Sequence, residues 1–343
     1  MIAEKIILNE ERNVSLTAYI QEVDGEFGFL RRPAMLVLPG GGYAMCSDRE
    51  ADAVATAYLQ AGFQTFILRY SVGSDKIWPQ PLEDYEQTME LIKENAEKWH
   101  VDTAHISVVG FSAGGHLAAC AATMAKNKPM AAILVYPAIV KDILHICSID
   151  NLPEVHTAVT TETSPCFLVA ARDDRTVNVK NTLLFQLALE EKGIPFEGHI
   201  YSFGGHGFST ARAWINTNSV SERVPSWVED SIGWLKELGG ELTRAGFTES
   251  NLAVGKNGDF APVLSIGCSL RHIRKQNEEV QELLLPLFTS MEAVANARGY
   301  SVEELMTAMG ENTIRELMEM LQIPSEVMIG LDKQLHEIIN HLE

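Results

Sequence analysis

Gly110-Phe-Ser112-Ala-Gly114 lies between the apolar, strand-like run 106–109 and the helix-forming run 113–122. This G-x-S-x-G pattern predicts a sharp turn from a strand into a helix, because glycine on both sides lets the chain close around the serine. Such a turn holds the serine in a strained conformation and exposes its hydroxyl beside the N–H groups of the following helix. The alternative is a glycine-rich turn with an incidental serine, and the flanking strand and helix favour a nucleophile.

A second glycine-rich segment, Pro39-Gly-Gly-Gly42-Tyr43, follows the apolar run 34–38. Taken alone, such a loop binds nothing, binds phosphate, or donates backbone N–H groups to a developing anion. The candidate nucleophile Ser112 lies downstream of this segment. Acyl transfer requires preorganised hydrogen-bond donors for the oxygen of the attacked carbonyl. We therefore predict an oxyanion hole formed by the N–H of Ala113 and one from Gly41, Gly42 or Tyr43.

Two adjacent aspartates, Asp173 and Asp174, follow the apolar run 166–171. A carboxylate here can orient a histidine and stabilise the imidazolium that forms during catalysis. We favour Asp174 because of its D-x-x-V spacing to Val177, and Asp173 remains a candidate. The alternative is that both are solvated loop acids.

The general base is predicted to be His206, in the segment Phe203-Gly-Gly-His206-Gly-Phe208. A base for a serine approaches from a loop, and glycines on both sides give that loop room. The other histidines lack this setting, and His116, four residues after Ser112, suits packing or hydrogen bonding better. Ser112, Asp174 and His206 form the predicted catalytic triad, in that chain order.

Strand-like and helix-like patterns alternate through residues 1–240, which predicts an α/β domain with a mostly parallel sheet and helices on both faces. Residues 241–263 are expected to form a linker or irregular extension, and residues 264–343 an all-helical segment of unknown role. The expected strands are 34–38, 65–70, 106–109, 131–136, 166–170 and 199–201, and the expected helices are 51–62, 82–99, 113–122, 182–192 and 227–238.

The C-terminal segment carries its own helix signals. Ser301-Val-Glu-Glu304 is a capping box, and Ser325 is the expected cap of a last helix. That helix would carry Leu331, Leu335, Ile338, Ile339 and Leu342. The C-terminal segment has three candidate roles: a packed appendage, a homodimer interface or a lid over the pocket. We favour the first two.

The bulk composition excludes several function classes. The chain has 343 residues with 46 Asp+Glu against 27 Lys+Arg, a net charge of −19, which argues against a nucleic-acid partner. Five scattered cysteines without a CxxC indicate neither a disulfide framework nor a zinc site. We find no signal peptide or membrane-spanning run, so a cytoplasmic location without membrane association is expected. The chemistry above requires neither a metal nor an organic cofactor.

From about Arg32 to Leu238 the sequence resembles the esterases of the α/β-hydrolase superfamily, in particular the branch related to acetyl xylan esterases. The order Ser…Asp…His is the one expected of that superfamily. Pro39 stands where hormone-sensitive-lipase-like enzymes carry histidine, and Asn178 stands where relatives often carry proline. The matching segments are Pro39–Tyr43, Ser47–Ala51, Leu68–Ser71, Gly110–His116, Asp174–Val177 and His206–Phe208.

The resemblance implies hydrolysis of acetyl esters of sugars or oligosaccharides, with Ser112 forming an acyl-enzyme. Aromatic side chains that would line the substrate pocket are Trp78, Phe208 and Trp214, each of which is otherwise a core residue. A serine peptidase or amidase and a non-catalytic, ligand-binding relic are the alternative functions.

Overall fold

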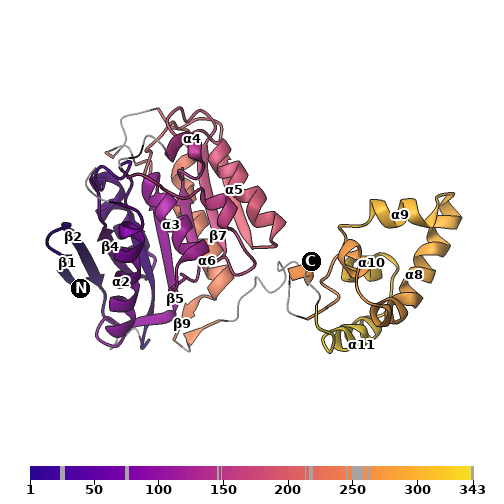
Figure 1. Cartoon of the computed structure of the whole chain (residues 1–343). Helices are drawn as coiled ribbons and strands as arrows, with labels where there is room; N and C mark the ends of the chain where they lie inside the picture. The colour runs from indigo at the N-terminus through magenta and orange to yellow at the C-terminus, as the bar shows by residue number, and fades with distance from the viewer. Residues whose placement is uncertain are drawn as a thin grey trace. The chain divides into compact units, whose positions relative to one another are not determined.

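The computed structural model describes residues 1–23, 28–73, 77–144, 147, 149–212, 214–215, 219–244, 246–248, 258–260 and 263–340. The chain divides into two compact units, Met1–Leu252 and Ala253–Glu343. The described part of the first unit contains an eight-stranded sheet in the order β1-β2-β4-β3-β5-β6-β7-β8 (Figure 1). The strands are β1 (Ile2–Asn9), β2 (Val14–Ile20), β3 (Arg32–Leu38), β4 (Gln64–Arg69), β5 (Val101–Phe111), β6 (Ala132–Val135), β7 (Cys166–Ala171) and β8 (Phe196–Tyr201).

The sheet is parallel from β4 to β8, and β1 and β2 join it antiparallel. Parallel neighbours require crossover helices, which cover both faces and explain the continuous apolar strands. The expected α/β class with a mostly parallel sheet is confirmed. The helices of this unit are α1 (Asp52–Gln60), α2 (Gln80–Glu94), α3 (Ala113–Met124), α4 (Lys141–Leu144), α5 (Lys180–Glu191) and α6 (Trp227–Gly239), with short 3₁₀ turns at Asp48–Glu50, Val155–Ala158 and Val224–Ser226.

Each face of the sheet has its own hydrophobic core. Alternate residues of a strand enter opposite cores, as Leu36 and Val37 of β3 do. Helices α2, α3 and α5 pack on the first face, and α1 and α6 pack on the second. Each fully buried aliphatic side chain contributes roughly 1.5–3 kcal/mol relative to exposure. The two cores therefore fix the strand ends from which the functional loops emerge.

Strands β1 and β2 were absent from the sequence prediction. Their signal is present in β2, where Val14, Leu16, Ala18 and Ile20 alternate with other residues and are buried. Strand β1 pairs with β2 and lies at the edge of the described sheet. Its residues are mostly exposed or half-buried, so apolar and polar residues do not alternate clearly along it. The sequence of this segment therefore does not predict a strand.

The predicted linker 241–263 contains the end of one unit and the start of the other. Strands β9 (Leu242–Thr243) and β10 (Gly246–Phe247) form a hairpin in the first unit. The Phe247 ring stacks on His105 with centroids 3.7 Å apart, and His105 Nε2 lies 2.9 Å from the Gly239 carbonyl oxygen. In the second unit the Asp259 carboxylate accepts hydrogen bonds from the backbone N–H and the hydroxyl of Ser269.

The second unit is helical and encloses a separate apolar core around Leu264, Ile273, Leu284 and Leu317. The predicted capping box of Ser301 and Glu304 is present, and Thr313 with Glu316 forms another; a cap of this type is worth about 0.5–2 kcal/mol. Its helices are α7 (Leu270–Ile273), α8 (Glu278–Arg298), α9 (Val302–Ala308), α10 (Ile314–Met320) and α11 (Ser325–Leu335), after a 3₁₀ turn at Gly258–Phe260.

Two details predicted for the last helix are wrong. Pro324, and not Ser325, occupies the N-cap position, because proline is favoured next to the first helical turn. The helix ends at Leu335, so Ile338 and Ile339 lie beyond it, and Ile339 instead forms a β-bridge with Val263. Leu342 lies outside the described residues. None of the helices in the described ranges is both long and apolar enough to cross a membrane.

Because His116 is buried, we expect the free energy of unfolding to depend on pH. The Tyr43 hydroxyl lies 2.8 Å from His116 Nδ1, and Nε2 lies 2.9 Å from the Pro153 carbonyl oxygen. This pattern fits a neutral ring that accepts at Nδ1 and donates at Nε2. Burial lowers the pKa of His116 from 6.5 to about 4, so this histidine stabilises the fold fully above pH 6.5 and loses that contribution as the pH falls toward 4.

We expect this contribution to reach about 3 kcal/mol of unfolding free energy. Urea unfolding of the wild type and of His116→Gln at several pH values between 7 and 4 measures it. The stability of the wild type should fall more steeply with decreasing pH than that of the variant, whose amide does not titrate. Equal slopes would contradict the assignment.

Candidate active site

The turn that holds Ser112 lies directly between β5 and α3. Ser112 has φ 52° and ψ −114°, a combination that costs about 1–3 kcal/mol for a side-chain-bearing residue. A Cβ on Gly110 would lie 2.2 Å from the Gly114 carbonyl oxygen, and one on Gly114 would lie 2.1 Å from the Leu38 carbonyl oxygen. Both flanking glycines are therefore required by close backbone approach, as the motif predicted.

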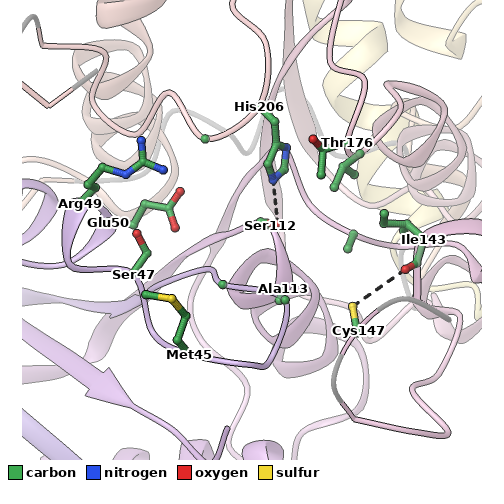
Figure 2. Close-up of a pocket in the computed structure, with 15 residues that line it drawn as sticks. Met45, Ser47, Arg49, Glu50, Ser112, Ala113, Ile143, Cys147, Thr176 and His206 are labelled. Carbon is green, nitrogen blue, oxygen red and sulfur yellow. Dashed lines mark hydrogen bonds between the residues drawn. The ribbon is translucent and has the colours of Figure 1, made fainter. Parts of the chain in front are cut away.

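Ser112, His206 and Asp174 form a continuous hydrogen-bonded chain. His206 Nε2 lies 2.9 Å from Ser112 Oγ (Figure 2), and His206 Nδ1 lies 2.7 Å from Asp174 Oδ2. In the neutral tautomer that fits both contacts, Ser112 donates to Nε2 and Nδ1–H donates to the carboxylate. The structure thus brings together the three residues selected as the triad, although they are far apart in sequence.

The carboxylate of Asp174 is held from its other side by the backbone. Its Oδ1 accepts hydrogen bonds from the N–H groups of Thr176, at 2.8 Å, and Val177, at 2.9 Å. The residue is only 3% exposed, so the charge is shielded from water and aimed at the imidazole. The D-x-x-V spacing has a physical basis here, since the turn that buries Val177 also supplies one of the donors.

The neighbouring Asp173 has a different position and a different partner. Its Oδ1 accepts hydrogen bonds from the backbone N–H groups of Gly204, at 2.8 Å, and Gly205, at 2.9 Å. The hydrogen bond from Gly205 is the main reason that the pKa of Asp173 lies below its ordinary value. Asp173 therefore anchors the loop that carries His206, while Asp174 contacts the imidazole.

Three of the four residues proposed for the oxyanion hole line a cavity beside Ser112: Gly41, Gly42 and Ala113. Gly41 has φ 134°, and a Cβ on it would lie 2.2 Å from the Met45 carbonyl oxygen. Ala113 is the first residue of α3, whose opening N–H groups have no partner within the helix. Tyr43 is not among the lining residues; its side chain is buried, with the hydroxyl directed to His116.

The cavity has a volume of about 400 Å³ and two chemically different sides. Ser112 and His206 lie between them in Figure 2, with Ile143, Cys147 and Thr176 on one side and Met45, Ser47, Arg49 and Glu50 on the other. The remaining lining residues are Ala138, Val177 and Gly207.

The aromatic residues predicted for the pocket do not line this cavity. Trp78 packs its ring edge against His116 with centroids 5.7 Å apart, and Phe208 is fully buried against Tyr136. Trp214 is 78% exposed. Phe208 does not line the cavity because its side chain packs in the second hydrophobic core, where burial of an apolar ring is favourable.

Sequence reasoning did not select the actual lining residues Met45, Arg49, Glu50, Ile143 and Cys147. A signal existed for two of them, since Arg49 and Glu50 belong to the segment 47–51 that carries the family resemblance. Ile143 lies in the short helix α4 and Cys147 lies three residues after that helix, in a part of the sequence that has no distinctive pattern. Within the residues that the structure describes, no group of three or more His, Cys, Asp or Glu side chains is placed to hold a metal ion.

Comparisons with known proteins agree with the α/β-hydrolase fold. A family model described as BD-FAE matches residues 30–135. The crystal structure of MGS-M1, an α/β-hydrolase enzyme from a Medee basin deep-sea metagenome library, is 36% identical with a TM-score of 0.64, over 69% of this chain and 98% of that one.

Two curated relatives have names that concern xylan. Endo-1,4-beta-xylanase B of Butyrivibrio fibrisolvens is 31% identical over 57% of this chain and 35% of its own length. Acetylxylan esterase of Xylanibacter ruminicola is 28% identical over 60% of this chain and 45% of its own length. The chain thus spans less than half the length of these relatives.

Substitution of Asp173 and of Asp174 should have different effects on activity, because the two carboxylates have different partners. Asp174→Asn should lower kcat for p-nitrophenyl acetate by about 10³–10⁴-fold near pH 7, because an amide no longer selects the imidazole tautomer or stabilises the imidazolium. Asp173→Asn is the matched control and should lower it by less than about 10-fold, because an amide oxygen still accepts the two backbone N–H groups. A larger loss in Asp173→Asn would transfer the orienting role to that residue.

Proposed function

The chain belongs to the α/β-hydrolase superfamily, among its esterases, and we propose that it hydrolyses small acyl esters, specifically acetyl esters of sugars or oligosaccharides. The observation that carries the proposal is the hydrogen-bonded chain from Ser112 through His206 to Asp174, beside a cavity that Gly41 and Gly42 also line. The xylan-related names of the curated relatives support the choice of acetylated sugars.

In the proposed first half-reaction Ser112 Oγ attacks the ester carbonyl carbon while His206 Nε2 accepts its proton. Asp174 stabilises the resulting imidazolium through the hydrogen bond to Nδ1. The carbonyl oxygen becomes negative and accepts hydrogen bonds from backbone N–H groups around Gly41, Gly42 and Ala113. One such donor is typically worth about 3–4 kcal/mol of transition-state stabilisation.

The intermediate then collapses as His206 donates its proton to the departing alcohol, leaving the acyl group on Ser112. Water then attacks the acyl-enzyme carbonyl while His206 accepts a proton from it, and His206 returns that proton to Ser112 Oγ as the bond to the acyl group breaks and the carboxylic acid leaves. In both steps the groups that the protein contributes are Ser112, His206, Asp174 and the backbone N–H donors.

The two sides of the cavity support separate binding of the two halves of the substrate. Ala138, Ile143 and Val177 are apolar and suit a short acyl chain. Ser47 and Arg49 offer hydrogen-bonding groups and suit the hydroxyls of a sugar alcohol. The cavity of about 400 Å³ lies at the small end of ligand pockets, which supports acetyl over long acyl chains.

The central test is hydrolysis of p-nitrophenyl acetate and of acetylated xylo-oligosaccharides by the wild type and by Ser112→Ala. We expect turnover by the wild type and a loss of at least about 10⁴-fold in the variant, because the nucleophile is removed. Circular dichroism confirms that the variant is folded.

Other substrates decide between the alternatives. Faster cleavage of an aminoacyl p-nitroanilide than of the acetyl ester would favour a peptidase or amidase. Absence of turnover on every ester and amide would favour a ligand-binding relic.

We further propose that the helical unit joins two copies of the chain. Several large apolar side chains of that unit are exposed, among them Leu285, Met320, Val327 and Ile329, and such side chains are common at homodimer interfaces. Light scattering should give twice the chain mass of 37.9 kDa for the full-length protein and one chain mass for a variant ending at residue 252. A full-length mass of one chain would contradict this proposal.

A further inference from the structure

A buried carboxylate at the wall of the cavity has no part in the two half-reactions above. Glu50 is 4% exposed and lines the cavity beside Ser112 and His206 (Figure 2). Its Oε2 lies 2.8 Å from the backbone nitrogen of Gly40, and its Oε1 lies 2.6 Å from the Tyr136 hydroxyl. A buried charge is costly unless it is paired and hydrogen-bonded, so its presence here calls for a function.

One oxygen of Glu50 holds the loop that supplies the oxyanion donors. Gly40 precedes Gly41 and Gly42, and its N–H donates to Oε2. A Cβ on Gly40 would lie 2.7 Å from that same oxygen, so the close approach requires glycine. The carbonyl oxygen of Gly40 accepts a hydrogen bond from the Ser47 N–H at 2.8 Å. The start of this loop is thereby fixed on both sides.

The other oxygen of Glu50 reaches the loop that carries the base, through Tyr136. The Tyr136 hydroxyl donates to Glu50 and accepts a hydrogen bond from the backbone N–H of Ser209 at 3.0 Å. The Tyr136 ring also packs edge-on against the His206 imidazole, with centroids 4.9 Å apart and planes at 61°. Tyr136 has φ 39°, an unfavourable conformation that its hydrogen bonds help to maintain.

The donor pattern indicates that Glu50 is ionised. The Gly40 N–H can only donate, and the Tyr136 oxygen already accepts from Ser209, so its own proton is directed to Glu50. Both carboxylate oxygens are therefore acceptors. The charged or titratable groups that face Glu50 within the described structure are Arg49, Tyr70, Tyr136 and His206. Burial raises the pKa of Glu50 above its ordinary value, and the hydrogen bonds from Tyr136 and Gly40 and the charges of His206 and Arg49 offset only part of that rise.

We propose that Glu50 is a positioning residue that holds the oxyanion loop and the His206 loop in register and, as an anion, stabilises the protonated imidazole formed when Ser112 attacks. The inference rests on the proposed serine mechanism, though not on the identity of the ester. A second anion near the imidazole favours its protonated form. Glu50 contacts neither Ser112 nor substrate in this scheme, and acts through Gly40 and Tyr136.

The test uses the full-length chain and a probe that reports on Ser112 without needing an ester substrate. In a fluorophosphonate, Ser112 Oγ attacks phosphorus, its proton passes to His206, and fluoride leaves as the Oγ–P bond forms. Mass spectrometry measures the second-order labelling rate from pH 5 to 9. Hydrolysis of p-nitrophenyl acetate is measured in parallel for kcat, KM and the pH profile of kcat/KM.

In Glu50→Gln we expect the labelling rate and kcat to fall by about 10–100-fold while KM changes less than about 3-fold. Misplaced oxyanion donors weaken the transition state, in which the carbonyl oxygen becomes negative, more than they weaken substrate binding. The acid limb of both pH profiles should move to lower pH, since the loss of an anion disfavours the imidazolium. A purely structural role would lower the rates without moving that limb. Glu86→Gln is the matched control, because Glu86 also accepts backbone N–H groups, from Lys126 and Asn127, and does not line the cavity.

A second variant keeps the inference testable if Glu50→Gln does not fold. Tyr136→Phe retains the carboxylate and the Gly40 contact but removes the link to Ser209, so kcat and labelling should fall with a smaller displacement of the acid limb. Wild-type rates and an unmoved acid limb in either variant would overturn the inference. Rapid labelling of Ser112 without turnover of any ester would instead overturn the substrate assignment alone.

Discussion

The backbone turn at Ser112 is the constraint on which the rest of the site depends. It holds an unfavourable φ and ψ at the serine that we propose as the nucleophile, and such strain persists only where surrounding packing maintains it. The packing is backbone against backbone: Gly114 lies so near the Leu38 carbonyl that no side chain fits between them. Helix α3 therefore rests directly on the end of β3, and the nucleophile and the oxyanion loop that follows β3 are fixed relative to each other.

The remaining groups reach Ser112 because parallel strands end at the same edge of the sheet. Asp173 and Asp174 follow β7, and His206 follows β8, its neighbour in the sheet. Each loop is then held by a carboxylate that accepts backbone N–H groups: Asp174 closes its own turn, Asp173 holds the glycines before His206, and Glu50 holds Gly40. Charged acceptors make stronger hydrogen bonds than neutral ones, so these three acids hold the loops that surround the cavity beside Ser112.

The sequence alone determined the class of fold and selected the residues that we propose as the catalytic triad. Apolar strands alternating with helices allow a parallel sheet and little else, and the glycines around Ser112 and His206 mark positions where the backbone must approach closely or turn sharply. These signals are local, because each arises from the conformational demands of a few consecutive residues. For the same reason strand β1, which lies at an edge and buries little, left no readable pattern.

Only the tertiary structure decided which residues surround the reacting atoms. Trp78 and Phe208 are aromatic, and Phe208 lies two residues after His206, yet both pack against other rings, while Ile143 and Cys147 line the cavity. The separate roles of Asp173 and Asp174, and the link from Gly40 through Glu50 and Tyr136 to Ser209, depend on distances between segments that lie up to 169 residues apart along the chain (209 − 40). No local pattern encodes such distances, since they are set by how two hydrophobic cores stack helices against one sheet.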